Sequence, residues 1–282
     1  MHARDTYGIA IRIAIACLAL TLSGCGSTVP RETPPSAAAG TRLSELTVES
    51  DAVGAELDVS VLEPAGEGPS GRRPLLVFLH GSGGSEESFV EERVVLTNLM
   101  RLGRRAPVMA FPDGDEGWWH DRESGDWGQY VVREVIPAVG RRFDTDPRRV
   151  AIGGISMGGY GAYHLGLEYP QRFCAVGGHS AGLWPTGGEE FPGAFDDAAD
   201  HQRNDVLATV AEDPGTFGEA RVWNDYGDQD WFATGNEAFV DALEGDHANL
   251  TAHVWPGGHD YLYWNAHWRD YLRFYANALA RC

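Results

Sequence analysis

The order of apolar runs and helix-like segments constrains the fold of this chain more than any other feature of its sequence. Residues 74–79 (PLLVFL) are continuously apolar, as in a strand buried on both faces, and the run stops at a glycine-rich turn, residues 80–84 (HGSGG). The same reading predicts further strands at 108–111, 149–153, 173–177, 220–226 and 250–255 and helices at 86–101, 129–143 and 236–243. Strands that alternate with helices form a mostly parallel sheet with helices on both faces, so the sequence predicts an α/β fold.

Other segments predict how this sheet begins and how it is covered. Residues 43–49 and 55–62 alternate between apolar and polar side chains around a turn at Gly54, which indicates an antiparallel lead-in to the sheet. Residues 182–216 are acidic and rich in glycine and proline, and we expect them to form a small loop-rich cap above the sheet. The last segment carries apolar side chains at helical spacing, which predicts a helix whose apolar stripe faces the sheet: Trp264, Trp268, Tyr271, Leu272 and Tyr275.

The N-terminal region has the pattern of an export signal followed by a tether. Residues 1–24 combine a weakly basic start with an apolar run, residues 13–22, that is too short to span a bilayer. The run ends in LSGC, which is similar to a bacterial lipobox, so Cys25 is expected to be lipidated and to anchor the chain in the cell membrane. An ordinary secretory signal with an incidental cysteine is the alternative, and both place the protein outside the cytoplasm. Residues 25–40 are rich in Pro, Ser and Ala and predict a flexible tether.

Length, charge and cysteine content exclude several classes of protein. A chain of 282 residues with 43% hydrophobic residues is expected to form one folded domain, here residues 41–282. The formal net charge of −19 repels phosphate backbones, so nucleic acid is not expected as a partner. Cys174 and Cys282 could pair in an oxidising compartment, or Cys174 could be a small buried hydrophobic residue. No CxxC pair, HExxH or EF-hand pattern occurs, so we expect no metal and no other cofactor.

The strongest chemical signal is a GxSxG motif at residues 154–158 (GISMG). It lies between a predicted strand and a helix-like segment, and the glycines leave room for a tight strand-to-helix turn with the Ser156 hydroxyl at its tip. The start of the helix places backbone N–H groups where negative charge develops during acyl transfer. The motif predicts Ser156 as a nucleophile, and the alternative is a glycine-rich turn without catalysis.

A serine hydroxyl needs a base, and the base needs an orienting carboxylate. Where this motif is catalytic, the chain order is Ser, then Asp or Glu, then His. The candidate bases are four histidines near the C-terminus, and the one that follows Pro-Gly-Gly in a predicted loop is favoured: His247, His253, His259 and His267, with His259 as the choice. For the acid, the segment after a predicted strand offers Asp230, our choice, with Asp228 and Asp225 as alternatives.

A tetrahedral intermediate also needs two N–H donors for its oxyanion. The residue after the nucleophile, Met157, is expected to provide one, and the glycine turn after the first central strand is expected to provide the other at Ser82. His80 opens that turn and is a second candidate base, although a histidine in this position is more often structural.

The segments HGSGG, FPDGDEGWWHD, GISMGGYGA, YGDQD and GGHDYLYW together resemble the esterase-D-like branch of the α/β-hydrolases. This branch includes feruloyl and acetyl-xylan esterases, S-formylglutathione hydrolases and mycolyltransferases, and the resemblance runs from about residue 75 to residue 279. It implies an α/β-hydrolase catalytic domain at residues 41–282. Carried over residue by residue, it implies Ser156, Asp230 and His259 as the catalytic triad, with the oxyanion N–H groups at Ser82 and Met157.

The resemblance implies a secreted serine esterase that hydrolyses small acyl or carbohydrate-linked carboxylic esters through an acyl-enzyme. One alternative is an acyltransferase that moves the acyl group to a sugar hydroxyl with the same triad, and another is a catalytically inactive binding lipoprotein. The expected partners are a small-molecule, polysaccharide or lipid ester and, through lipidated Cys25, a membrane. Trp118 and Trp119 lie in a predicted loop near the site and could stack on a substrate or serve as loop anchors.

Overall fold

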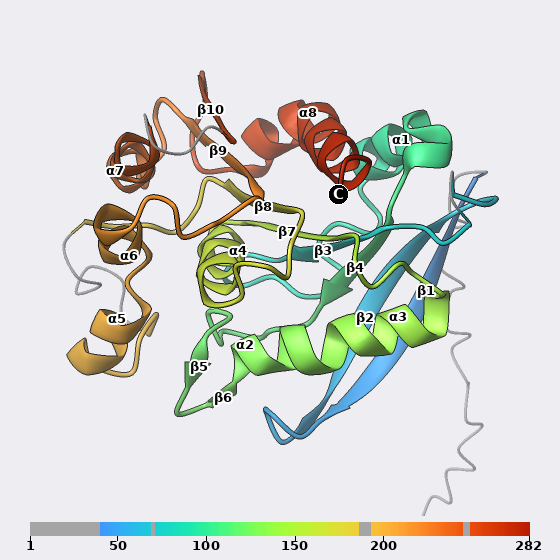
Figure 1. Cartoon of the computed structure of the whole chain (residues 1–282), viewed down its shortest axis with the longest axis horizontal. Coiled ribbons are helices and arrows are strands. Elements are labelled where there is room, and N and C mark those ends of the chain that lie inside the picture. Colours follow the sequence, from blue (N-terminus) through green and yellow to red (C-terminus); the bar gives the residue numbers. More distant parts are fainter. Residues whose placement is uncertain (1–39, 69–70, 186–192, 245–248) are drawn as a thin grey trace, which may run out of the picture. The chain divides into compact units, whose positions relative to one another are not determined.

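The computed structural model describes residues 40–68, 71–185, 193–244 and 249–282 (Figure 1). Its central element is an eight-stranded sheet with the strand order β1-β2-β4-β3-β7-β8-β9-β10. The bounds of these strands are β1 Thr41–Ser50, β2 Ala55–Pro64, β3 Leu75–Leu79, β4 Val108–Pro112, β7 Val150–Ile155, β8 Ala175–His179, β9 Arg221–Gly227 and β10 Leu250–Trp255. The predicted signal peptide and Cys25 lie outside the described residues, as does nearly all of the predicted tether.

The strands are mostly parallel. β4, β3, β7, β8, β9 and β10 run in the same direction, whereas β2 pairs antiparallel with both β1 and β4. Among the described residues, a second, two-stranded sheet is formed by β5 (Asp121–Arg122) and β6 (Gly125–Asp126). The mostly parallel α/β fold and its antiparallel lead-in are therefore confirmed.

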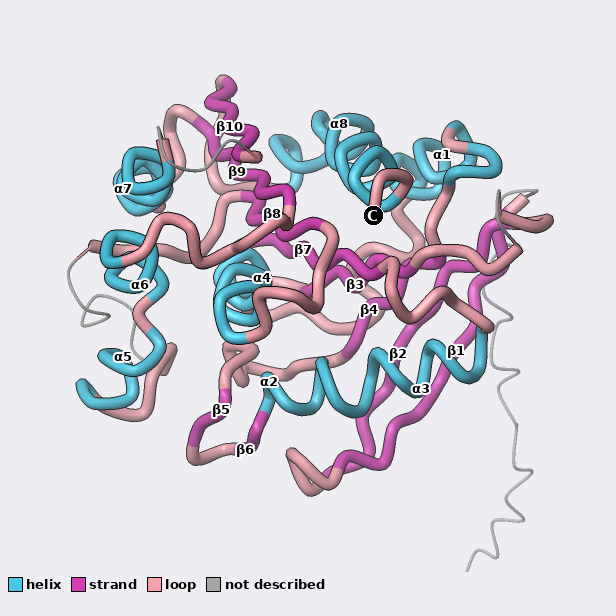
Figure 2. Tube along the Cα trace, viewed as in Figure 1, coloured by secondary structure: helices cyan, strands magenta, loops and turns pink. Residues whose placement is uncertain are grey.

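Helices cover both faces of the sheet (Figure 2). Their bounds are α1 Arg93–Arg101, η1 Gly103–Arg105, α2 Trp127–Gln129, η2 Tyr130–Val135, α3 Ile136–Phe143, α4 Met157–Glu168, α5 Ala198–Asn204, α6 Val206–Glu212, α7 Ala233–Leu243 and α8 Tyr261–Leu279. α1 and α8 pack on one face, and α3, α4, α6 and α7 pack on the other. Within the described part of the chain, no helix combines the length and apolar character needed to span a bilayer.

Strand β3 shows why its sequence is apolar at every position. Leu75, Val77 and Leu79 point into the core beneath α3 and α4, whereas Leu76 and Phe78 point into the core beneath α1 and α8. All of these side chains are fully buried, because neighbouring residues of a strand face opposite sides and both sides are covered. The packing on both faces therefore fixes the position of the end of β3, directly before the glycine turn at residues 80–84.

Two segments differ from their sequence-based predictions. The predicted helix at 86–101 begins only at Arg93, because residues 85–88 form a turn in which Ser88 Oγ accepts the Ser85 N–H and Ser85 Oγ accepts the Glu87 N–H. The predicted loop at 182–216 contains helices α5 and α6, which are directly preceded by Asp197 and Asp205. The side chains of these two aspartates accept backbone N–H groups of the first helical turn, so acidic residues that suggested a loop act as N-caps.

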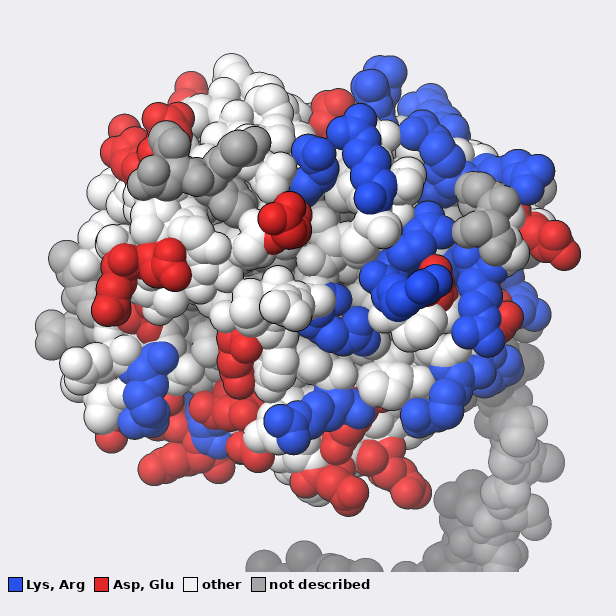
Figure 3. Space-filling view, viewed as in Figure 1, with Lys and Arg blue, Asp and Glu red and all other residues white. Residues whose placement is uncertain are grey.

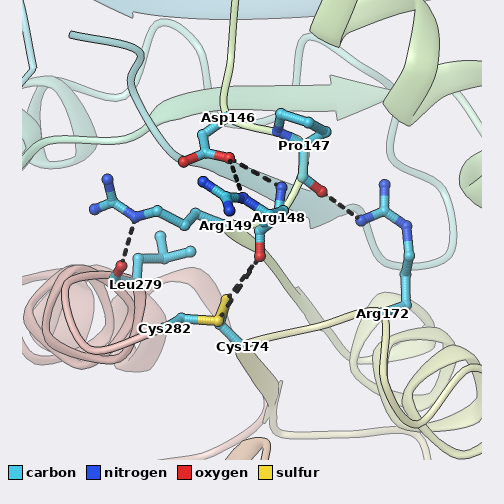
Figure 4. Close-up of a disulfide and its surroundings, with 8 residues drawn as sticks. All are labelled: Asp146, Pro147, Arg148, Arg149, Arg172, Cys174, Leu279 and Cys282. Atoms are coloured by element: carbon cyan, nitrogen blue, oxygen red, sulfur yellow. Dashed lines mark hydrogen bonds and ion pairs between the residues drawn. A yellow bond between two sulfur atoms is a disulfide. The ribbon is translucent and has the colours of Figure 1, made fainter. Parts of the chain in front are cut away.

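A disulfide joins Cys174, directly before β8, to Cys282 at the end of the chain (Figure 4). The two Cα atoms are 5.8 Å apart. Close by, the Arg149 guanidinium donates a hydrogen bond to the carbonyl of Leu279 in α8. The pairing that the sequence left open is thus present, and it fastens the end of α8 to the edge of the sheet where the parallel strands begin.

Candidate active site

Ser156 lies in the tight turn between β7 and α4. Its backbone has φ 56° and ψ −117°, a conformation that a residue with a side chain rarely adopts. The Ser156 N–H donates to the carbonyl of His179, and the Ser156 carbonyl accepts the N–H of Gly182. These bonds hold the strained turn on both sides, so the serine hydroxyl projects from the end of β7 where the carboxyl ends of the parallel strands meet.

The two glycines of the motif are required by close backbone contacts. A Cβ atom at Gly154 would lie 2.3 Å from the carbonyl oxygen of Gly158, and a Cβ atom at Gly158 would lie 2.2 Å from the carbonyl oxygen of Leu79. Both distances are far below van der Waals contact with backbone atoms that cannot move aside. The motif G-I-S-M-G therefore forms a turn in which the junction of β7 and α4 packs directly on the end of β3.

His259 connects Ser156 to Asp230. Its Nε2 atom lies 2.9 Å from Ser156 Oγ, and its Nδ1 atom lies 3.0 Å and 3.1 Å from the two carboxylate oxygens of Asp230. Since a carboxylate only accepts, Nδ1 carries the proton and Nε2 is left free to accept the serine hydroxyl. Asp230 is buried, and the Phe232 N–H also donates to its Oδ1 at 2.8 Å. The structure thus brings together the three residues chosen from the sequence.

The alternative acids and bases lie elsewhere. Asp228 is exposed and accepts the N–H of Gly257, so it ties together the two loops that carry Asp230 and His259. His253 and His267 both stack on Trp255, with ring centroids 4.6 Å and 3.9 Å apart. His247 lies outside the described residues.

Asp225, the third candidate acid, is fully buried and belongs to a different network. It accepts hydrogen bonds from His179 Nδ1 and Trp223 Nε1, at 2.7 Å and 2.6 Å, and from the hydroxyls of Tyr263 and Tyr271, each at 2.8 Å. The other ring nitrogen of His179 lies 3.0 Å from the hydroxyl of a further tyrosine of α8. This second Asp-His pair joins β8 and β9 to α8, and the carbonyl of the same His179 accepts the Ser156 N–H.

The glycine turn after β3 lies beside the tip of the serine turn, since a Cβ atom at Gly81 would be 3.2 Å from Ser156 Cβ. The Glu116 carboxylate holds this turn by accepting the Gly83 N–H at 2.5 Å and the Ser82 hydroxyl at 2.7 Å. Met157 is the first residue of α4, where an N–H has no acceptor within the helix. No sequence pattern singles out Glu116, which lies in the loop after β4.

His80 is a structural residue rather than a base in this arrangement. It is buried, its Nδ1 atom lies 2.9 Å from the carbonyl oxygen of Gly81, and its Nε2 accepts the N–H of Gly114 at 3.0 Å. Both ring nitrogens are therefore engaged with backbone groups. The ring joins the glycine turn to the loop after β4.

The two tryptophans that could have bound substrate are buried in the core. Trp119 donates a hydrogen bond from its ring to the carbonyl of His80, and Trp118 packs edge-on against Tyr160 and Trp184. Neither ring presents an exposed face, so the prediction of substrate stacking at these positions is wrong. They are loop anchors, the other interpretation that the sequence allowed.

A cavity of about 270 Å³ opens at Ser156. Its walls are mainly aromatic and include no Asp, Glu, Lys or Arg side chain: Gly81, Ser82, Phe89, Ile155, Ser156, Trp231, Phe232, His259, Tyr261 and Trp264. Trp231 is 76% exposed, and its ring centroid lies 5.0 Å from that of His259. Sequence reasoning missed this residue, although its place directly after Asp230 could have indicated it.

Comparisons with known proteins agree with this fold and with an esterase activity. The model of the Esterase family, described as "Putative esterase", matches residues 50–275. An acetyl esterase of Caldicellulosiruptor saccharolyticus is 23% identical over 67% of this chain and 78% of that protein. An esterase of Mycobacterium tuberculosis is 29% identical over 49% of this chain, which spans about a third (32%) of that protein's length. The solved structure of a ferulic acid esterase superposes with a TM-score of 0.74 at 20% identity, covering 85% of this chain and 99% of that one.

The eight-stranded sheet, with a serine at the sharp turn after β7, defines an α/β-hydrolase fold. The chain belongs to the Esterase family and is a carboxylic-ester hydrolase.

Proposed function

We propose that the chain is a serine esterase that works through an acyl-enzyme on Ser156. His259 Nε2 takes the hydroxyl proton as Ser156 Oγ attacks the acyl carbon, and the tetrahedral oxyanion accepts the N–H groups of Ser82 and Met157. The imidazolium then gives its proton to the leaving alcohol. Water, deprotonated by the same histidine, attacks the acyl-enzyme, and the acid and free serine are released. Asp230 holds the histidine in the required tautomer throughout and stabilises the imidazolium.

The observation that carries this proposal is the unbroken chain of contacts from Ser156 Oγ through His259 to Asp230, at 2.9 Å and 3.0 Å. The serine and histidine are 103 residues apart, and local chain geometry alone would not bring them together. The strained backbone of the serine supports the same role, since such strain is retained where it positions a reacting group.

The walls of the cavity support compact, uncharged esters as substrates. Pockets for small molecules usually measure about 300–1,000 Å³, so a cavity of about 270 Å³ suits a small acyl group rather than a long chain. The aromatic rings of Phe89 and Phe232 supply apolar surface, and the exposed Trp231 offers a ring face to an acyl group or a sugar. The names of the similar acetyl and ferulic acid esterases agree with esters of compact acyl groups. We further propose that the protein is exported and anchored by a lipid on Cys25.

The test is the loss of turnover in Ser156→Ala. We expect hydrolysis of p-nitrophenyl acetate to fall to near background, with an unchanged circular dichroism spectrum. Wild-type protein should be labelled once by a fluorophosphonate, and the adduct should map to Ser156. Ser44→Ala, on the remote strand β1, is the matched control and should retain full activity. Retained turnover or labelling in Ser156→Ala would reject the assignment of the nucleophile.

A further inference from the structure

Exposed arginines gather at one edge of the sheet, where the parallel strands begin. They lie in the segments that lead into these strands and at the ends of the helices, and we call them the arginine edge: Arg101, Arg104, Arg105, Arg141, Arg148 and Arg281. Three contacts join these segments to one another. Arg73 donates to the carbonyls of Arg104 and Ala106, Arg105 donates to Asn277 of α8, and the disulfide fastens the residue after Arg281 to the start of β8.

The opposite edge of the sheet has the opposite charge. The loops at the carboxyl ends of the strands carry the exposed carboxylates of Glu87, Glu116, Asp228 and Asp260. Arg122 on that side is paired with Asp196 at 2.7 Å. Figure 3 shows arginine side chains gathered over α1, the end of α8 and the end of α3, while carboxylates gather near α5 and β6. The net charge of −19 is therefore distributed unevenly, and the arginine edge is a local exception to it.

The N-terminal segment joins the domain at this same edge. β1 begins at Thr41, which pairs with Pro64 at the end of β2, and Leu62 of β2 pairs with Met109 near the start of β4. The Gly40 carbonyl accepts the Ala65 N–H, and a Cβ atom at Gly40 would lie 3.5 Å from the sulfur of Met100, the residue before Arg101. A membrane anchor in residues 1–39 would therefore be connected to the domain at the arginine edge.

An anionic surface next to the arginine edge would be attracted by the arginines there, because the carboxylates that dominate the net charge lie farther away. A five-residue strand is about 17 Å long, and this length separates the two edges of the sheet. Charges are screened over roughly 8 Å at physiological ionic strength, so the carboxylates at one edge have little effect at the other. Guanidinium groups also bind phosphate oxygens in a bidentate manner. Some carboxylates reduce the effect, because Arg72 is paired with Asp144 at 2.8 Å and Asp146 lies 3.8 Å from Arg148. Arg104, Arg141 and Arg281 have no carboxylate within ion-pair distance among the described residues.

We propose that the arginine edge docks on an anionic lipid surface, so that the cavity at Ser156 opens away from the membrane. The proposed lipid on Cys25 would hold the chain at the bilayer, and the arginines would set its orientation. In that orientation the enzyme takes esters from the aqueous phase rather than from the bilayer beneath it. The proposal depends neither on the identity of the nucleophile nor on lipidation, because the charge contact exists without either.

The test measures binding of the full chain to vesicles, with Cys25→Ala in every variant so that acylation at this position is absent. Vesicles of phosphatidylcholine are compared with an equimolar mixture of phosphatidylcholine and phosphatidylglycerol. The apolar run at residues 13–22 is common to all variants and could bind either kind of vesicle. The quantity compared is therefore the increase in affinity when phosphatidylglycerol is present. The test variant is Arg104→Gln/Arg141→Gln/Arg281→Gln. The control, Arg93→Gln/Arg133→Gln/Arg269→Gln, removes the same charge from exposed positions outside the arginine edge.

We expect protein with the intact arginine edge to bind the anionic vesicles more tightly than the neutral ones. The test variant, which lacks three arginines, should lose about 100-fold of its affinity for the anionic vesicles. The control should lose much less, and added salt should remove the difference. Equal losses in the two variants, or no preference for phosphatidylglycerol, would overturn the proposal. Turnover of a water-soluble ester should be the same for bound and free protein, and inhibition on binding would contradict the proposed orientation.

Discussion

The Glu116 carboxylate accepts a hydrogen bond from the backbone N–H of Gly83 at 2.5 Å, and so joins the loop after β4 to the turn after β3. The same carboxylate accepts the hydroxyl of Ser82, whose backbone N–H is the proposed oxyanion donor. Glu116 contacts no reacting atom, so we regard it as a positioning residue for the oxyanion turn.

Replacing Glu116 with alanine should therefore slow the chemical step. Loss of an oxyanion donor typically costs about 100- to 1,000-fold in kcat, and loosening the turn that carries one should cost about tenfold, with a smaller change in KM. Glu116→Gln keeps one oxygen acceptor for the Gly83 N–H and should recover part of the loss. Glu87→Ala, an exposed carboxylate in the adjoining loop, is the control. A change in KM alone would contradict the positioning role.

Asp230→Asn and Asp228→Asn should differ strongly although they lie two residues apart. The first substitution presents an amide to His259 and favours the wrong imidazole tautomer, which can lower kcat by about 10,000-fold. The second weakens the contacts of Asp228 with the Gly257 N–H and the Gln229 side chain, neither of which involves His259, and should cost less than about tenfold. Steady-state kinetics of both variants on one ester provide the comparison. A larger loss in Asp228→Asn would show that the acid is assigned wrongly.

Gly158→Ala should destabilise the fold, because its Cβ would lie 2.2 Å from the Leu79 carbonyl oxygen. We expect a loss of at least about 3 kcal/mol in the free energy of unfolding, within the range of large single-residue effects. Gly140→Ala, within α3, is the matched control. Its Cβ would lie 3.7 Å from the Thr145 hydroxyl oxygen, which is an ordinary van der Waals distance. Alanine there should stabilise the helix by up to about 1 kcal/mol. Denaturant unfolding of both variants checks the prediction, which fails if the two behave alike.

Breaking the disulfide should lower stability without removing activity. Cys174 and Cys282 are 108 residues apart, and a link that closes a loop of this length typically contributes about 2–5 kcal/mol. The bond lies at the edge of the sheet opposite the cavity, so kcat should be unchanged below the melting temperature. Cys282→Ser and reduced wild-type protein should melt at the same lowered temperature, while Cys25→Ser should melt like the wild type. An unchanged melting temperature in Cys282→Ser would show that the bond adds no stability.

The tyrosines around Asp225 should make the fold sensitive to alkali. Burial, together with the negative charge of Asp225, raises the pKa of Tyr263 and of Tyr271 above the ordinary tyrosine value. Above pH about 10 the unfolded chain releases phenolic protons that the folded chain retains, so the free energy of unfolding falls as the pH rises. Each such tyrosine should contribute up to about 1.4 kcal/mol per pH unit.

Alkaline titration followed by tyrosinate absorbance and circular dichroism tests this prediction. The buried tyrosines should ionise together with the loss of structure rather than before it. Tyr271→Phe removes one donor to Asp225 and should be less stable at neutral pH, yet its stability should fall less steeply above pH 10. An identical slope in the variant would contradict the assigned cause.

Much of this molecule follows from local sequence patterns. The apolar run at residues 75–79 predicts a strand buried on both faces, because each side chain must face one of two cores. The motif around Ser156 predicts the turn, because backbone atoms approach too closely there for any residue but glycine. His259 was distinguishable from His253 and His267 because it alone follows a glycine pair in a loop.

Contacts between distant segments were decided only by the tertiary structure. Asp228 and Asp230 have the same chemistry and nearly the same place in the chain, and only the path of the loop brings the second to His259. Tryptophan in a loop suggests a binding site equally at Trp118 and Trp231, but packing buries the first and leaves the second exposed beside His259. Periodicity and composition report what one segment prefers, whereas burial and hydrogen-bond partners depend on which other segments the fold brings next to it.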